Sequence, residues 1–494
     1  MFVAPDPGRL RLRVSLRAVL GVGLAVAAAE LAGFSLTASI TGGLAALLAL
    51  FTVTDPTVRR QAVTTALLPA VGFPVLALAA SLHALPLARD AAFLAVVFAG
   101  VYARRWGARG HALGIFAFMM FFATQFLDAL PAQLPELYAA VALALVASST
   151  VRFGLWCIER RTPPAAAPAP LAGHGLARPS TRQAFQATAA CAFALVVGQL
   201  LSGERWYWAV GAAWWIFVNT ASRGETLVRG FRRVLGTVVG IAAGLVIAVP
   251  LHGAPAPTAA LVAACVFGIF YTAAPSYSWM MFFVTVMVGL LYGLLGVLHP
   301  GLLGLRVAET VVGALGAGLA VLLILPITTH RATDAWIKRA LHCVHACTSE
   351  AAARLAGRPD ADPARHVAEL DVLLGRVRLA LAPLVHPLAP LRARKARARR
   401  ILELLDRCAQ EVRGLASVAA DPGASHDDRL AAACARVEVA VRALTGPTAS
   451  AGRSEQGAAP QHPNGAAPAL THLHGLEQAL KALAAPLAGP TASA

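Results

Sequence analysis

Charged side chains are scarce in this sequence, and the motifs that mark common soluble enzymes are missing. Only 14% of the 494 residues are charged, whereas soluble domains carry about 25%. The chain has no P-loop, no GxGxxG after a strand, no HExxH and no GxSxG. These absences exclude ATP-driven transport by this chain and the common enzyme chemistries. We therefore predict that the protein is not an enzyme and requires no cofactor.

Cysteine is also scarce, with 7 residues and no CxxC pair, which argues against a disulfide framework. His342, Cys343, His345 and Cys347 are spaced so that they would meet on one helix and hold a soft metal. An amphipathic helix whose sulfurs pack inward explains the same spacing. We favour the second interpretation and predict no metal site.

Hydrophobic residues make up 57% of the chain, and they come in blocks of about the length that crosses a bilayer as a helix. We predict an all-α membrane protein with about twelve transmembrane helices. The first six blocks are residues 14–33, 36–53, 61–82, 91–102, 112–127 and 137–156. The second six are residues 184–201, 207–220, 234–251, 258–274, 279–298 and 302–325.

The arginines predict the orientation of these spans. Basic residues gather in every second connection, at 9–17, 59–60, 104–109, 160–161, 223–233 and 331–339. Because cytoplasmic loops are enriched in Lys and Arg, we place the N- and C-termini in the cytoplasm. No basic stripe alternates with exposed aromatics, so we expect a lipid bilayer and no nucleic acid as partner. The arginine- and alanine-rich composition is typical of a high-GC bacterial coding bias.

We predict five segments. Residues 1–161 and 181–329 form two six-span membrane halves, joined by a Pro- and Ala-rich cytoplasmic linker at 162–180. Residues 330–445 read as amphipathic helices of a cytosolic domain, and 446–494 as a mostly disordered tail with a short helix. An even number of spans per half predicts that the two halves lie parallel.

Glycines and ionisable residues within the apolar blocks supply the site candidates. Gly236, Gly240 and Gly244 share one helix face and predict close contact with another helix, and Gly313, Gly316 and Gly318 predict the same in the last span. Charges at membrane depth mark ion or substrate paths by default. The proton-coupling candidates are Glu30, Glu309 and Glu136. The anion-contact candidates are Arg306, Arg17 and Arg182.

Two of these features have a structural alternative. Arg306 and Glu309 lie three residues apart on one face, so they would also suit a structural ion pair. The tryptophans of ERWYWAVGAAWW we interpret as an interfacial belt rather than as an aromatic-binding box.

The stretch YWAVGAAWWIFVNTASRGETLVRGFRRVLGTVVGIAAG resembles the fusaric acid resistance (FUSC) family, which is related to aromatic acid exporters. The matching residues are Tyr207, Trp208, Ala209, Arg223, Arg229, Arg233, Val234, Leu235, Gly236, Thr237 and Gly240. The resemblance implies an inner-membrane exporter of aromatic or other weak organic acids, driven by the proton gradient. It carries no substrate-binding residues onto this chain.

We therefore expect efflux of a small organic acid through the seam between the halves. A passive organic-anion channel, which the distant similarity to plant malate-type channels implies, is the first alternative. A non-transporting membrane scaffold that uses the C-terminal domain for docking is the second. A homo-oligomer and a periplasmic accessory protein both remain open as partners.

Overall fold

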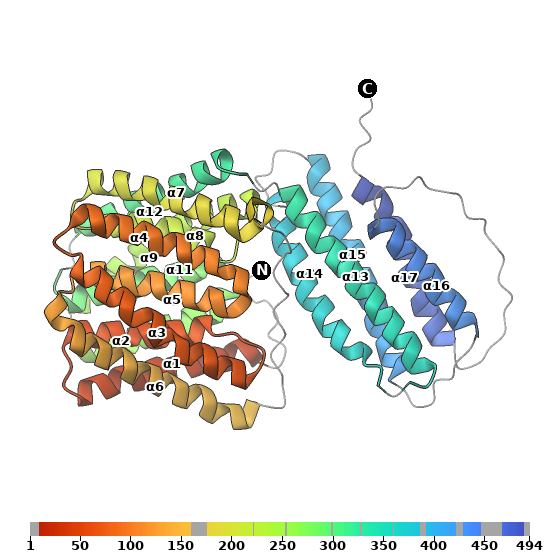
Figure 1. Cartoon of the computed structure of the whole chain (residues 1–494), viewed down its shortest axis with the longest axis horizontal. Coiled ribbons are helices and arrows are strands. Elements are labelled where there is room, and N and C mark those ends of the chain that lie inside the picture. Colours follow the sequence, from red (N-terminus) through yellow and green to blue (C-terminus); the bar gives the residue numbers. More distant parts are fainter. Residues whose placement is uncertain are drawn as a thin grey trace. The chain divides into compact units, whose positions relative to one another are not determined.

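The chain forms two compact units, Met1–Ile327 and Thr328–Ala494, in a computed structural model (Figure 1). The structure describes residues 9–159, 175–220, 222–251, 254–297, 300–326, 329–358, 360–385, 392–420, 428–445 and 467–488. Every regular element in these ranges is a helix, which confirms the all-α prediction. The predicted linker therefore lies mostly outside the described residues.

The first unit contains one α-helix for each predicted apolar block. In the first six these are α1 (Leu10–Leu31), α2 (Leu36–Thr52), α3 (Val58–Ser81), α4 (Pro86–Tyr102), α5 (Gly107–Phe126) and α6 (Leu134–Glu159). In the second six they are α7 (Pro179–Leu201), α8 (Tyr207–Phe217), α9 (Arg223–Leu251), α10 (Pro255–Ala273), α11 (Tyr277–Leu294) and α12 (Pro300–Leu323).

Length and hydropathy identify 9 candidate membrane spans among the described residues. One of them, Pro86–Phe126, contains both α4 and α5, with the short 3-10 helix Ala103–Trp106 between them. Helix α2 has 17 residues, and α8 has only 11. At 1.5 Å per residue, α8 is about 16 Å long, roughly half of a hydrocarbon core. The protein is a multi-pass membrane protein, and twelve crossings stay a prediction.

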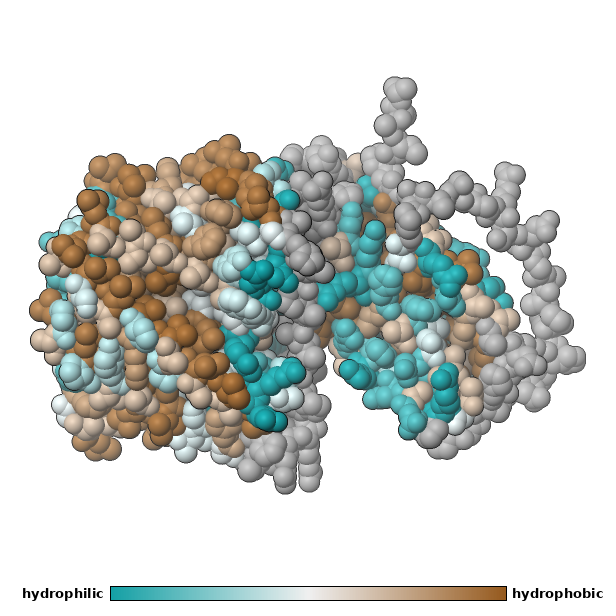
Figure 2. Space-filling view, in the orientation of Figure 1, coloured by the Kyte–Doolittle hydropathy of each residue, from teal (hydrophilic) through white to brown (hydrophobic). Residues whose placement is uncertain are grey.

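The outer surface of the first unit suits lipid. Large apolar side chains such as Val146, Leu200 and Val246 are mostly exposed there. Figure 2 shows hydrophobic side chains over most of the visible face of this unit and hydrophilic ones gathered at one end of its helices. Exposed apolar surface of this extent is unfavourable in water and favourable in a bilayer.

The packing of the first six helices recurs in the second six. Helix α1 packs against α2 and α6, and α7 packs against α8 and α12 in the same way. Likewise α5 contacts α3 and α4, as α11 contacts α9 and α10. The two sets meet where α1 packs on α10 and where α4 packs on α7. The α1–α10 and α4–α7 contacts correspond to each other when α1 is matched with α7 and α4 with α10.

Four of the six predicted glycine contacts are close, whereas Gly244 and Gly318 make only looser contacts. A Cβ on Gly236 would overlap the carbonyl oxygen of Ser278 on α11, and one on Gly240 would lie 2.9 Å from the carbonyl oxygen of Phe282. A Cβ on Gly313 would lie 2.6 Å from the carbonyl oxygen of Ala209 on α8. Because lipid supplies no hydrophobic drive between helices, such close backbone approach stabilises α9 on α11 and α12 on α8.

The second unit consists of amphipathic helices, as predicted from its periodicity. They are α13 (Thr329–Leu355), α14 (Pro363–Val385), α15 (Arg392–Ala419), α16 (Asp428–Thr445) and α17 (Ala467–Ala488). Their apolar faces pack together, and Val377, Cys408 and Leu476 are fully buried. Burial raises the pKa of the Cys408 thiol to about 12, so this cysteine is a neutral core residue at physiological pH. Most of the predicted disordered tail lies outside the described residues.

Candidate functional site

A cavity of about 580 Å³ lies between the two helix sets of the first unit. Its wall is contributed by α1, α2 and α5 from the first set and by α8 to α12 from the second. Cavities of about 300–1,000 Å³ are typical of small-molecule sites. The seam predicted from the sequence therefore contains enough space for a small ligand.

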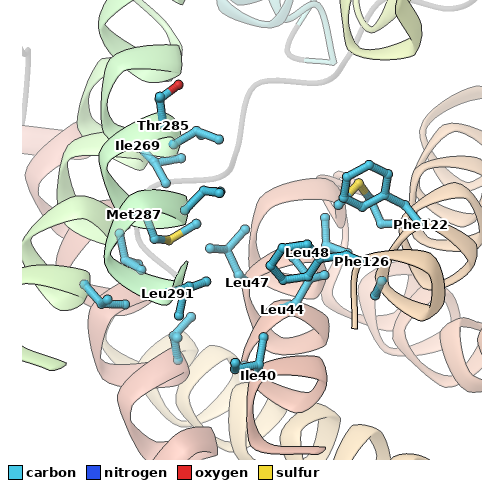
Figure 3. A pocket seen from close by; sticks show the side chains of 18 of the residues that line it. Ile40, Leu44, Leu47, Leu48, Phe122, Phe126, Ile269, Thr285, Met287 and Leu291 are labelled. Carbon is cyan, nitrogen blue, oxygen red and sulfur yellow. The ribbon is translucent and has the colours of Figure 1, made fainter. Parts of the chain in front are cut away.

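The wall of the cavity is mainly apolar. Figure 3 shows Leu47 of α2 pointing toward Met287 and Leu291 of α11, with Phe122 and Phe126 of α5 on the other side. Methionine is flexible and polarisable and therefore adapts to ligands of different shapes. A wall of this kind binds the apolar part of a ligand without selecting one particular shape.

Arg306 of α12 is a cation in this wall, with only 6% of its surface exposed. Its guanidinium carbon lies 3.4 Å from the centre of the Trp208 ring, so the two groups form a close cation–π contact. The Trp208 Nε1 donates a hydrogen bond of 2.6 Å to the Tyr292 hydroxyl, which fixes the ring that supports Arg306. The cation is thus held by aromatic rings, and its hydrogen-bond donors suit an oxyanion.

Arg233 of α9 is a second cation in the wall, with 7% of its surface exposed. Its Nη1 donates to the Tyr277 hydroxyl at 3.3 Å and lies 3.0 Å from the Met281 sulfur. Arg233 and Arg306 are electrostatic neighbours. From the sequence, Arg233 was predicted only as part of a basic turn and of the family motif. The missed signal is that Arg233, Gly236 and Gly240 share the helix face that packs on α11.

Glu309 is fully buried on α12, one turn after Arg306. Neither carboxylate oxygen has a hydrogen-bond partner among the described residues. Arg306 is its strongest electrostatic neighbour, but the described residues include no hydrogen bond or ion pair between them. In the part of the chain that the structure describes, these two side chains are therefore electrostatic neighbours without a direct hydrogen bond. A buried carboxylate without a donor is costly when ionised, and protonation removes that cost.

The other acidic candidates occupy different places. Glu30, at the end of α1, is exposed and contributes to the cavity wall. Glu136 lies outside the wall, and its carboxylate accepts a hydrogen bond of 2.5 Å from the backbone N–H of Ser35, which precedes α2. Glu136 therefore caps the N-terminus of α2 in this structure.

The two remaining arginine candidates also lie outside the cavity wall. Arg17 is partly buried on α1 and is an electrostatic neighbour of Arg152. The Arg182 Nε donates a 2.5 Å hydrogen bond to the carbonyl oxygen of Leu176 near the start of α7. The cavity thus brings together Glu30 and Arg306 among the predicted site residues, with Glu309 adjacent to Arg306.

The residues of the family motif are divided between the cavity and the helix contacts. Trp208, Arg233 and Thr237 contribute to the cavity wall. Tyr207 is buried beside Phe122 and Trp208, and Arg223 is exposed at the start of α9. Gly236 and Gly240 make the contacts with α11 described above.

The tryptophans of this motif do not form the predicted interfacial belt. Trp214 is 1% exposed and stacks on Phe118 with the ring centres 3.9 Å apart, and Trp206 is also buried. Trp208 and Trp215 contribute to the cavity wall. The interfacial interpretation was wrong because α8 lies inside the bundle, where contacts with α7 and α12 cover it.

The fold and the cavity define a multi-pass, all-α membrane protein with a ligand-sized site between two similarly packed helix sets. Residues 191–321, from α7 to α12, match the family model described as fusaric acid resistance protein-like. This match confirms the resemblance found in the arginine- and glycine-rich segment. No curated protein matches the chain.

Proposed function

We propose that the protein exports aromatic or other hydrophobic weak organic acids across the bacterial inner membrane through the seam cavity. One observation carries the proposal, an apolar cavity whose wall includes Arg233 and Arg306. Such an acid has an apolar ring and one carboxylate. The ring suits the Leu, Met and Phe wall, and the carboxylate suits charge-assisted hydrogen bonds from a guanidinium.

The position of the cavity supports alternating access. Transporters built from repeats bind substrate at the repeat interface and move one repeat against the other. In the cavity wall, Glu30, Leu36 and Pro255 are exposed, whereas Arg233, Met280 and Met281 are buried. The cavity is therefore closed toward the start of α9. The arginines predict that the start of α9 is cytoplasmic. A cavity that is closed toward the cytoplasm and open at its other end corresponds to the outward-facing state of a transporter.

In this proposal Glu309 carries the coupling proton. Arg306 stands in the cavity wall and Glu309 does not, yet the two are electrostatic neighbours. Because a substrate carboxylate and an ionised Glu309 would both interact with Arg306, substrate binding and the protonation state of Glu309 are linked. Glu30, at the exposed end of the cavity, is a second candidate for exchanging this proton.

Transport measured in proteoliposomes tests the anion site. We expect Arg306→Gln to raise the KM for a labelled benzoate-type acid by at least about tenfold, because hydrogen bonds to charged groups contribute about 1.5–3 kcal/mol. Arg105→Gln is the matched control, since Arg105 also stacks on an aromatic ring, Tyr102, but lies outside the cavity wall. Equal effects of the two substitutions would contradict the assignment.

An imposed pH step at clamped membrane potential tests the coupling. Wild-type export should accelerate when the compartment that receives the organic acid is made more acidic. The transport rate of Glu309→Gln should not change with this step. Glu136→Gln, which changes only a helix cap, should keep the response. Flux through the wild type that follows the anion gradient and ignores the pH step would identify a channel. A wild type without any organic-acid flux would leave the scaffold alternative.

A further inference from the structure

The second unit brings a sulfur, an imidazole nitrogen and a carboxylate oxygen together between two helices. Cys343 lies on α13, and His366 and Glu369 lie one turn apart on α14. Their candidate ligand atoms all lie within 4.8 Å of one another. The His366 Nδ1 is 3.8 Å from a Glu369 carboxylate oxygen. This group differs from the four residues of α13 that the sequence spacing brought into consideration.

Local packing holds this group in place. Cys343 and Cys347 are both buried on the face of α13 that packs against α14, which confirms the inward-facing sulfurs expected from the sequence. The Cys343 thiol donates to the backbone carbonyl oxygen of His366 at 3.3 Å. His342 is exposed, so it does not share the side of α13 where the sulfurs lie. The ligand set is therefore completed by α14 and not by the histidines of α13.

The imidazole of His366 provides an independent observation. Its Nδ1 is buried and has no hydrogen-bond partner among the described residues. Buried polar atoms are normally hydrogen-bonded, so an orphaned one requires an explanation. A metal ion beside Cys343 and Glu369 would satisfy this nitrogen.

We propose that Cys343, His366 and Glu369 bind a Zn²⁺ ion that links α13 to α14. Thiolate sulfur, imidazole nitrogen and carboxylate oxygen are the three ligand types that Zn²⁺ takes in proteins, and a water molecule completes a tetrahedral site with three protein ligands. The thiolate disfavours Mg²⁺ and Ca²⁺, which prefer oxygen. Because Glu369 is about half exposed, the ion can enter and leave without unfolding of the unit.

Metal titration of the purified full chain in detergent tests this site. After chelator treatment, we expect the wild type to take up one Zn²⁺ per chain. Co²⁺ should give the visible and thiolate charge-transfer absorption of a tetrahedral site. Because even outer-sphere partners contribute about 10- to 100-fold to metal affinity, we expect Cys343→Ser and Glu369→Gln each to weaken Zn²⁺ binding at least about tenfold.

Two controls keep the test decisive. Cys408→Ser removes another buried thiol, on α15, and should leave Zn²⁺ affinity unchanged. Glu369→Gln alters a half-exposed side chain, so it leaves the core intact even if Cys343→Ser impairs folding. Absence of stoichiometric binding, or binding that neither Cys343→Ser nor Glu369→Gln weakens, would overturn the proposal.

Discussion

At the scale of single residues, the support of Arg306 by an aromatic ring is the feature most relevant to anion binding. An arginine paired with a carboxylate has its donors occupied, whereas stacking on Trp208 uses the face of the guanidinium and leaves its edge for hydrogen bonds. The hydrogen bond from Trp208 to Tyr292 orients that ring. The affinity of the cavity for a carboxylate therefore depends on residues that need not touch the substrate.

We expect Trp208→Phe to raise the KM for an aromatic acid about three- to tenfold. A phenyl ring stacks more weakly with arginine and cannot donate to Tyr292, and each of these losses is about 0.5 kcal/mol. Trp206→Phe is the matched control, because Arg89 stacks on the buried Trp206 at 4.8 Å outside the cavity wall. Initial rates in proteoliposomes measure both variants. A rise in KM for Trp206→Phe as well would mean that packing, and not the support of Arg306, is responsible.

At the scale of elements, glycines determine which helices approach most closely. Helix α9 packs along α11 through Gly236 and Gly240, and both glycines meet backbone carbonyl oxygens of the partner helix. A backbone atom cannot move aside as a side chain can. These two helices also carry Arg233 and Met281, so their separation sets the geometry of one cavity wall.

We expect Gly240→Ala to destabilise the protein by about 1–3 kcal/mol, because the added Cβ overpacks the contact with α11. It would lie 2.8 Å from the Cβ of Thr285 and 2.9 Å from the carbonyl oxygen of Phe282. The control is Gly23→Ala on α1, where nothing lies within 4 Å of an added Cβ. The midpoint of thermal unfolding in detergent should fall for Gly240→Ala only. An unchanged midpoint for Gly240→Ala would show that the α9–α11 contact can relax.

At the scale of the whole molecule, the candidate transport site belongs to the first of the two units, Met1–Ile327. Its helix sets share a packing pattern and meet where α1 packs on α10 and α4 on α7. The cavity lies at this seam, with exposed residues at one end of its wall and buried ones at the other. We therefore expect water to enter this cavity from one side of the membrane.

Thiol labelling in a variant without the native cysteines tests this asymmetry. We expect Leu44→Cys, in the cavity wall, to react with a membrane-impermeant maleimide from the side opposite the start of α9. An aromatic acid should slow the reaction. Val146→Cys on α6 is more exposed but lies outside the cavity wall, in the apolar surface assigned to lipid, where a thiol does not ionise. Equal labelling of both positions would contradict a water-filled seam.

Hydropathy alone predicted the helices well, because a helix that spans lipid must satisfy its backbone internally and present apolar side chains along its length. The buried charge of Arg306 and Glu309 was predictable for a related reason, since an ionisable residue at membrane depth turns away from lipid. The tryptophans of α8 were wrongly predicted to lie at the membrane interface, because interfacial and buried tryptophans have the same sequence pattern in an apolar run. Arg233 was assigned to the basic turn, although it lies far enough along α9 to reach the cavity.

By itself, the sequence determined the all-α membrane class, the order of the helices, the glycine contacts and the resemblance to fusaric acid resistance proteins. These properties depend on local composition and on spacing along one helix. Only the tertiary structure decided that Arg233 and Arg306 share a cavity and that His366 and Glu369 lie beside Cys343. Contacts between residues of different helices depend on which helices pack together. In lipid, helix packing depends on shape complementarity between segments that are distant in the sequence, and the periodicity within one segment does not encode it.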